Sequence, residues 1–298
     1  MTPKTFILGT RGSQLALRQS EMVRDALLQH FPTLQIELKI IKTKGDKLQH
    51  LSLDASGDKG LFTGALEEAL RAGEIDFAVH SLKDLPVDPA PGTRIAAYLP
   101  RAVTHDTLIG PMPLEALPEG ALIGTSSRRR AYQIAIHYPH LRTEPIRGNV
   151  ETRMGKVDAG LFDATLLAEA GLTRLDMKDV TRYPISEEII VPAPGQAAIA
   201  VQTRDEDGEL QPLLQQIHDA KTEREVTIER SLLKRLGGGC ALPLGCVCHI
   251  EGETAELRVF YANASGTEHY LATHRTPLSD IDTLLSQLIE RLQHITTA

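Results

Sequence analysis

Cysteine is scarce in this chain, and its scarcity excludes two classes of site. The three cysteines, Cys240, Cys246 and Cys248, lie close together near the C-terminal end. An odd and clustered set is not the disulfide framework of a secreted protein. Paired Cys-x-x-Cys knuckles are also missing, and residues 248 and 249 would point to opposite faces of a strand. We therefore expect no zinc or other metal site at these cysteines and His249.

Long apolar runs are missing as well. No window approaches 18 consecutive apolar residues without charge, so we expect no membrane span and no membrane partner. Residues 1–9 pass directly into a strand-like run, with no apolar stretch before a small-residue cleavage site. We therefore expect a cytoplasmic protein.

An excess of positive charge is the third absence. Lys and Arg number 32 against 39 Asp and Glu, and the net charge is −7, so a general nucleic-acid partner is not expected. The chain also lacks a P-loop and a Gly-x-Gly-x-x-Gly motif. Hydrophobic residues make up 42% and charged residues 24%, which is typical of a globular protein. A length of 298 residues predicts two or three domains.

Two landmarks recur in the same order and indicate an internal duplication. A strand-like run ending in Gly9-Thr10 leads into a helical pattern, and Gly124-Thr125 does the same. Ala72-Gly73 and Ala159-Gly160 each close a helix before a strand. Such alternation predicts two α/β lobes with partly parallel sheets, whose ligand-binding loops follow the strand ends. The first copy is longer, and we expect a mobile lid around residues 43–60.

The C-terminal part has a different pattern. A helix over about 222–236 precedes three strand-like runs and a closing helix from about residue 280, which predicts a smaller α+β domain. We expect hinges at 98–101 and 191–196, where two crossings would let the lobes close. The expected domains are a first lobe of 1–99 with 197–217, a second lobe of 100–196, and an α+β domain of 218–298.

Arginine recurs at or near predicted loops and helix starts. Helix N-termini offer backbone N–H groups, and arginine adds bidentate geometry, so both bind carboxylates and phosphates. The pattern predicts a pocket for a polyanionic ligand. The alternative is that these arginines are solvated or paired with acidic residues. They are Arg11, Arg128, Arg129, Arg130, Arg147, Arg153 and Arg174.

An acidic residue stands where it would oppose anion binding. Lys83 and Asp84 follow the apolar strand over residues 75–79, at its C-terminal end. A carboxylate in an anion pocket costs binding energy, so its expected purpose is to face developing positive charge or to transfer a proton. The alternative is an ordinary surface turn. Among the cysteines, Cys240 follows Gly237-Gly238-Gly239 and is expected to be presented, whereas Cys246 and Cys248 are expected as buried thiols.

Together these clusters resemble the porphobilinogen deaminase (hydroxymethylbilane synthase) family over nearly the whole chain. The resemblance implies a fold of two periplasmic-binding-protein-like lobes and a third domain. It implies a transferase that joins four porphobilinogen molecules head to tail, with release of ammonia, into a linear tetrapyrrole. It rests on six segments: Thr10-Arg11-Gly12-Ser13-Gln14-Leu15-Ala16-Leu17, Lys59-Gly60-Leu61-Phe62, Ala78 to Pro86, Gly124-Thr125-Ser126-Ser127, Arg147-Gly148-Asn149-Val150 and Gly238-Gly239-Cys240.

The resemblance also implies residue roles. A dipyrromethane cofactor would be held by a thioether to Cys240, and the enzyme would be a monomer. The catalytic residues would be Asp84, which corresponds to the catalytic acid, and Lys59, which would close over incoming carboxylates. The remaining cofactor-binding residues would be Lys83, Ser13, Ser127, Arg129, Arg130 and Arg147. The substrate-binding residues would be Arg11, Arg153 and Arg174.

Three positions depart from the family pattern. Arg128 stands where Leu is usual, Ala197 replaces a usual Gly, and Ala241 follows the cysteine where a polar residue is common. None removes a charged group with a catalytic assignment. Two other interpretations stay open: a two-lobed anion-binding protein, which would need neither Asp84 nor a presented Cys240, and a catalytically inactive relative.

Overall fold

The computed structural model describes residues 4–43, 63–238 and 242–296, and the chain divides into two compact units. Unit 1 consists of Met1–Ala102 and Ala197–Arg224, and unit 2 of Val103–Gln196 and Glu225–Ala298.

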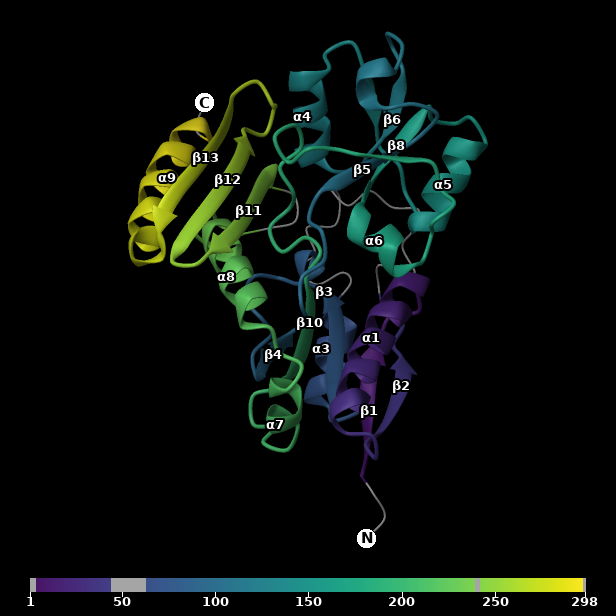
Figure 1. The fold of residues 1–298 in the computed structure, drawn as a ribbon, viewed down its shortest axis with the longest axis vertical. Coiled ribbons are helices and arrows are strands. Elements are labelled where there is room, and N and C mark those ends of the chain that lie inside the picture. The colour runs from purple at the N-terminus through teal and green to yellow at the C-terminus, as the bar shows by residue number, and fades with distance from the viewer. Residues whose placement is uncertain (1–3, 44–62, 239–241, 297–298) are drawn as a thin grey trace. The chain divides into compact units, whose positions relative to one another are not determined.

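Unit 1 is built on a five-stranded sheet in the order β2-β1-β3-β10-β4 (Figure 1). β1 is parallel to both β2 and β3, whereas β10 is antiparallel to β3 and β4. β10 therefore comes from a distant part of the chain to complete this sheet. The strands are β1 (Thr5–Thr10), β2 (Gln35–Ile40), β3 (Phe77–Ser81), β4 (Thr93–Tyr98) and β10 (Ile199–Arg204).

Helices cover this sheet because each presents an apolar stripe to it. α1 (Gln14–His30) begins at Ser13, whose hydroxyl accepts a hydrogen bond from the Ala16 backbone N–H at 3.3 Å. Its Val23 and Leu27 are fully buried in one core with Leu8, Phe77 and other strand residues. The other helices of unit 1 are α3 (Gly64–Arg71) and α7 (Leu210–Gln215).

Unit 2 contains a second sheet with the same pattern, in the order β7-β6-β8-β5-β9. β6 is parallel to β7 and β8, and β5 is antiparallel to β8 and β9. The strands are β5 (Asp106–Ile109), β6 (Leu122–Gly124), β7 (Arg142–Glu144), β8 (Ala164–Ala168) and β9 (Arg182–Pro184). The helices are α4 (Arg128–His137), α5 (Val150–Asp158) and α6 (Glu169–Arg174).

The two sheets repeat one local interaction, which confirms the predicted duplication. Asp76 accepts a hydrogen bond from the Ile7 N–H at 2.7 Å, and Asp163 accepts one from the Leu122 N–H at 2.7 Å. In each case the backbone N–H of the aspartate donates back to the same strand residue, at 2.8 and 2.9 Å. Gly73 has φ 71° and Gly160 φ 70°, where only glycine is unstrained.

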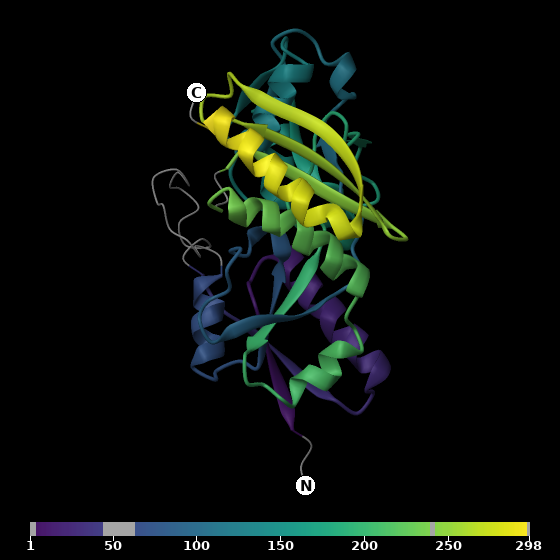
Figure 2. The ribbon, with the colours of Figure 1, turned by 90° about the vertical axis from the view of Figure 1, so that its left-hand side faces the viewer.

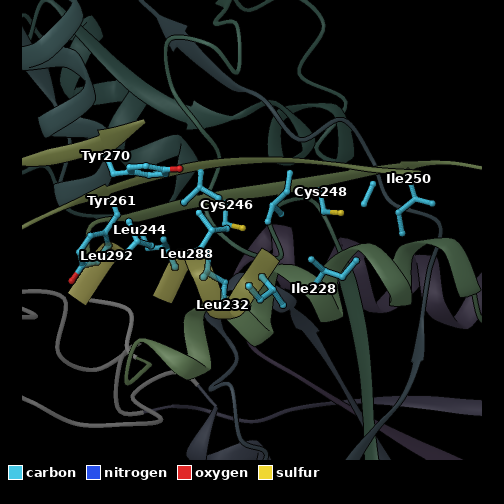
Figure 3. Close-up of a cluster of buried hydrophobic side chains, with 14 residues drawn as sticks. Ile228, Leu232, Leu244, Cys246, Cys248, Ile250, Tyr261, Tyr270, Leu288 and Leu292 are labelled. Carbon is cyan, nitrogen blue, oxygen red and sulfur yellow. The ribbon is translucent and has the colours of Figure 1, made fainter. Parts of the chain in front are cut away.

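A smaller α+β part completes unit 2. β11 (Leu244–Glu251), β12 (Thr254–Ala262) and β13 (His269–Pro277) form an antiparallel sheet in sequential order. α9 (Ile281–Thr296) lies along the sheet, with α8 (Ala220–Arg235) beside it (Figure 2). In the core between them, Cys246 and Cys248 lie near Ile228, Leu232 and Leu288 of the two helices (Figure 3).

The fold class is therefore as predicted: two α/β lobes of related topology and a smaller α+β part with three strands. Residues 103–196 and 225–298 belong to one compact unit. The predicted boundaries of three domains stay a prediction. The two expected hinges also stay predictions. In the described part of the chain, no helix is long and apolar enough to cross a membrane.

Ala197 has an unusual backbone conformation, with φ +69°. An L-residue in this left-handed region is destabilised by about 1 to 2 kcal/mol, a cost that glycine largely avoids. We expect Ala197→Gly to raise the free energy of unfolding by about 0.5 to 1 kcal/mol, less than the strain because glycine loses more entropy on folding. Urea denaturation followed by circular dichroism would measure the change. Its neighbour Ala198 has no positive φ, so Ala198→Gly should instead lower stability; equal effects of both substitutions would contradict strain at Ala197.

Candidate active site

A pocket of about 70 Å³ lies in unit 1. It lies where β1 and β3 end, since residues following both strands line it. Because these strands belong to one parallel set, their C-terminal ends meet at the same edge of the sheet. The polar side chains lining it in the described part of the chain are those of Arg11, Ser13, Gln19, Thr63, His80, Ser81 and Asp84.

Three of the predicted site residues meet in this pocket, each held by a different local feature. Arg11 follows β1, Ser13 caps α1, and Asp84 ends the 3-10 turn Leu82–Asp84 that follows β3. Leu82 is fully buried, and its N–H donates to the Ala198 carbonyl at 3.0 Å, which anchors the turn. Asp84 is left exposed to solvent at the pocket.

The electrostatics of the pocket favour an anion near Arg11 and the start of α1. The 17-residue helix directs its positive dipole end toward Ser13. Lys83, on the same turn as Asp84, is half-buried. Lys83 is not among the described lining residues, so its predicted cofactor contact stays a prediction.

His80 lines the same pocket, and it is 5% exposed. Burial lowers the pKa of His80 to about 4; a hydrogen bond to Gln202 opposes the shift, and the nearby Arg11 charge adds to it. The imidazole is therefore neutral near pH 7. Gln19 and Ser81 satisfy each other, with the Gln19 amide donating to the Ser81 hydroxyl at 2.9 Å.

In unit 2, the three consecutive arginines at the start of α4 have different surroundings. Ser127 caps the helix and accepts a hydrogen bond from the Arg130 N–H at 3.4 Å. Arg128 is exposed, whereas Arg129 and Arg130 are buried. Burial lowers the pKa of the Arg129 guanidinium, an effect that Asp106 opposes.

Asp106, at the start of β5, binds both buried guanidinium groups. Arg130 donates to it from Nε at 3.1 Å and from a terminal nitrogen at 2.7 Å, and Arg129 donates at 2.9 Å. Gln196 adds a fourth donor at 2.8 Å. The other terminal nitrogens of the two arginines donate to the carbonyls of Val191 and Leu166. These contacts order the two arginines from within the protein, and their predicted cofactor contacts stay a prediction.

We expect Asp106→Asn to be strongly destabilising. The substitution keeps the size of the side chain but leaves two buried guanidinium groups without their shared carboxylate, which costs about 3 to 5 kcal/mol. The measurement is the urea midpoint of unfolding. Asp158→Asn, at an exposed position in the same unit, is the matched control and should change stability by less than about 0.5 kcal/mol. A loss no larger than that of the control would show that the Asp106 network is dispensable.

Three other predicted arginines lie around α5 and α6 in unit 2. Arg147 precedes α5, which Asn149 caps by accepting the Thr152 N–H at 2.9 Å. The Nε of Arg153 donates to the Gly148 carbonyl at 2.9 Å. Arg174 is the last residue of α6, and burial lowers its pKa to about 10. All three residues are half-buried.

Two central predictions lie outside the described residues. These are Lys59, expected on a lid around residues 43–60, and Cys240, the expected site of cofactor attachment. Cys246 and Cys248 are fully buried, as predicted. No cluster of three or more potential metal ligands occurs among the residues that the structure describes.

Sequence reasoning missed Asp106, His80 and Thr63 as parts of these sites. His80 belongs to the segment on which the family resemblance rests, but its residue type alone did not indicate a pocket wall. Asp106 carries a readable signal: an acidic residue begins an apolar strand whose other residues are all buried. Such a residue needs a cationic partner, and the Arg129-Arg130 pair could have been considered.

The comparison with known families decides the relationship. A family model described as "Porphobilinogen deaminase, dipyromethane cofactor binding domain" matches residues 6–212, and one described as "Porphobilinogen deaminase, C-terminal domain" matches residues 223–280. The chain belongs to the porphobilinogen deaminase family. The resemblance inferred from the motifs is thereby confirmed.

Two relatives show how far the similarity extends. The porphobilinogen deaminase of Roseiflexus sp. (strain RS-1) is 45% identical over 257 residues, covering 86% of this chain and 85% of the relative. That of Desulforudis audaxviator (strain MP104C) is 41% identical over 291 residues, covering 97% and 94%. The similarity to porphobilinogen deaminases therefore extends over the segments that form all three sheets.

Two solved structures that match this chain share little sequence with it. The Bordetella pertussis BvgS periplasmic VFT2 domain matches with a TM-score of 0.43 and 14% identity, covering 76% of this chain and 92% of that one. The methionine binding protein MetQ matches with a TM-score of 0.43 and 10% identity, covering 76% and 94%.

Proposed function

We propose that the unit 1 pocket is the reaction site at which this porphobilinogen deaminase family member makes hydroxymethylbilane, with Asp84 as its catalytic residue. The observation that carries the proposal is the presence of Asp84 in one pocket with Arg11 and the capped start of α1. An anion-binding pocket gains nothing from a carboxylate unless a positive charge develops there. The activity makes the chain a transferase of tetrapyrrole biosynthesis.

The polar residues present fit a polycarboxylate ligand such as dipyrromethane, whose pyrroles carry acetate and propionate groups. The start of α1 in unit 1 and the starts of α4 and α5 in unit 2 are capped by Ser13, Ser127 and Asn149. Helix N-termini of this kind hold carboxylates. When bound, the dipyrromethane supplies a nucleophilic pyrrole carbon for the first condensation. We propose Ser13, Lys83, Ser127, Arg129, Arg130 and Arg147 as its binding residues and Cys240 as its point of attachment.

Asp84 fits the chemistry because the reaction passes through positive charge on the substrate. The carbon–nitrogen bond of the aminomethyl group breaks, and Asp84 can deliver the proton with which ammonia leaves. The ionised carboxylate then faces the cationic pyrrole that remains. After the new carbon–carbon bond forms, the α-proton is lost, and the same carboxylate can accept it.

The remaining assignments follow from the carboxylates of the elongating pyrrole chain, because each added porphobilinogen brings one acetate and one propionate group. We propose Arg11, Arg153 and Arg174 as binding residues for substrate carboxylates, and Lys59, with Asp84, as a member of the catalytic set that pairs with incoming carboxylates. A guanidinium group carries its positive charge at neutral pH. It pairs well with a carboxylate because two of its N–H donors match the two carboxylate oxygens. The monomeric state and the cytoplasmic location are proposed with the same enzyme.

Incubation of the purified chain with porphobilinogen tests the proposal. We expect a product that acid oxidation converts to uroporphyrin, and an intact protein mass that exceeds the sequence mass by one dipyrromethane. Absence of both from correctly folded protein would instead favour a two-lobed anion-binding protein. A cofactor mass without product would favour an inactive relative.

A further inference from the structure

The outer edge of β11 is bound by two buried carboxylates and one backbone carbonyl. β11 is an edge strand of the described sheet β11-β12-β13. Three alternate residues along it donate their backbone N–H groups to acceptors outside the sheet: Cys246, Cys248 and Ile250 (Figure 3). In that order, the acceptors are the Pro192 carbonyl at 2.8 Å, Glu229 at 2.8 Å and Glu225 at 3.0 Å. Both glutamates belong to α8, so this helix is hydrogen-bonded to the strand edge.

Glu229 makes a further contact with its second carboxylate oxygen. That oxygen accepts the Gly195 N–H at 2.7 Å. Glu229 is 0% exposed, and a buried carboxylate is costly unless hydrogen bonds satisfy it. Its two oxygens therefore join three parts of the chain: α8, β11 and residues 191–196, which we call the connecting segment. A glutamine has a single acceptor oxygen and would lose one of the two contacts.

The connecting segment is also bound to the arginine cluster of the second lobe. Near its start, the Val191 carbonyl accepts a hydrogen bond from the Arg129 guanidinium at 2.6 Å. At its end, the Gln196 side chain donates to Asp106 at 2.8 Å, the carboxylate that binds both buried guanidinium groups. One short segment thus contacts the arginine cluster and, through Glu229, α8 and β11.

β11 approaches the connecting segment without room for a side chain between them. A Cβ on Gly245 would lie 2.7 Å from the Val191 oxygen and 2.8 Å from its Cβ, so only glycine permits this approach. Val191 also shares a buried cluster with Val247 and Phe260 of the same sheet. The packing places the two backbones side by side, and Glu229 adds the polar contact that joins them to α8.

Glu229 joins the two elements that border the proposed attachment site. α8 ends at Arg235 and β11 begins at Leu244, so the residues around Cys240 connect them. We propose that Glu229 is a positioning residue for cofactor attachment, because it fixes both bordering elements against the segment that binds Arg129. This inference rests on the proposed function, in which Cys240 carries the dipyrromethane.

The attachment step explains why such positioning is useful. The sulfur of Cys240 forms a bond to the aminomethyl carbon of the first porphobilinogen, the carbon–nitrogen bond breaks, and the thiol proton leaves with ammonia. The rate of such a step decreases steeply when the reacting groups are held less precisely. The thiol and the arginines that bind the carboxylates lie on different segments, and Glu229 would hold these segments together without contacting the pyrrole.

Timed loading of the full chain tests the inference. Protein from a host that cannot make porphobilinogen would be mixed with porphobilinogen, and the intact mass would be followed until the dipyrromethane increment appears. We expect Glu229→Gln to load about tenfold more slowly than the parent. The kcat of the loaded variant should change less than about twofold, because Glu229 does not contact the substrate.

Glu225→Gln is the matched control. It removes the same charge one turn earlier on α8, from a side chain that is also buried and also binds β11. The glutamine oxygen can still accept the Ile250 N–H, so we expect loading at close to the parent rate. Equal slowing in Glu225→Gln and Glu229→Gln would assign the effect to charge or stability and overturn the inference.

Hydrogen exchange in the parent provides a second measurement, which applies even where Glu229→Gln does not fold. Coupling between attachment and positioning is reciprocal, so loading should slow exchange of the Gly195 amide more than that of the Ile250 amide. Equal exchange at Gly195 before and after loading, or parent-like loading of Glu229→Gln, would overturn the inference alone. A parent chain that never gains the dipyrromethane mass would overturn the proposed function as well.

Discussion

Replacing Asp84 with alanine is expected to abolish nearly all turnover of porphobilinogen while leaving the fold and the bound cofactor in place. The side chain is exposed at the end of a turn that Leu82 anchors, so its removal disturbs little packing. Loss of a preorganised group that faces developing charge costs about 3 to 4 kcal/mol, which corresponds to a rate decrease of roughly 10²- to 10³-fold. Loss of proton transfer decreases the rate further.

Product formation and intact mass should be measured on the same preparation. Asp84→Glu keeps the carboxylate at a displaced position and should retain a little activity. Asp88→Asn removes an exposed carboxylate four residues along the same loop and is the matched control, with activity close to that of the parent. Tetrapyrrole synthesis by Asp84→Ala at close to the parent rate would refute the catalytic assignment.

The architecture was predictable because its signals are local and repeated. Asp76 and Asp163 follow helix-closing glycines at equivalent places, and each holds one strand of its own sheet, β1 and β6 respectively, through a pair of hydrogen bonds. The local sequence therefore indicates this helix-to-strand connection: a glycine at positive φ ends the helix, and an aspartate stands just before the next strand. The positions of β5 and β10 in their sheets depend on pairings between distant segments. Local periodicity shows such strands but not their partners.

The arginines show where sequence reasoning ends. Arg128, Arg129 and Arg130 share one helix start and one residue type, so the sequence treats them alike. The structure leaves Arg128 exposed and buries the other two against Asp106, which begins β5, a separate and earlier element of the same lobe. Burial is decided by which helix face the sheet covers, and that is a tertiary property. The same holds for Thr63 and His80, whose relevance depends on sharing one pocket.

Ala197 shows the converse case. The family pattern has glycine at this position, and this difference already pointed to an unusual backbone conformation. The resemblance indicated glycine at this position, and the backbone has the positive φ that glycine adopts without strain. The chain therefore keeps the conformation at some energetic cost. The cost arises at the boundary between Gln196 of unit 2 and Ala197 of unit 1.

Replacing Cys240 with serine is expected to remove both the dipyrromethane mass and the activity while the protein still folds. A thioether requires a nucleophilic sulfur, and a serine hydroxyl is a far weaker nucleophile than a thiolate. Cys240→Ser should therefore stay inactive, or nearly so, even when supplied with preformed hydroxymethylbilane. The intact mass of the variant should equal its sequence mass, and circular dichroism should match that of the parent.

The other two cysteines are the matched controls, because their environment excludes attachment. Cys246 and Cys248 are fully buried between the three-stranded sheet and α8 and α9, where no bulky ligand can reach the sulfur without opening the core (Figure 3). Cys246→Ser and Cys248→Ser should keep the adduct and the activity, and lose about 1 to 3 kcal/mol of stability because each buries a hydroxyl among apolar side chains. Peptide mapping of the parent then decides the assignment: a pyrrole adduct on either buried cysteine, or an active Cys240→Ser enzyme, would overturn it, since each requires a nucleophile other than Cys240.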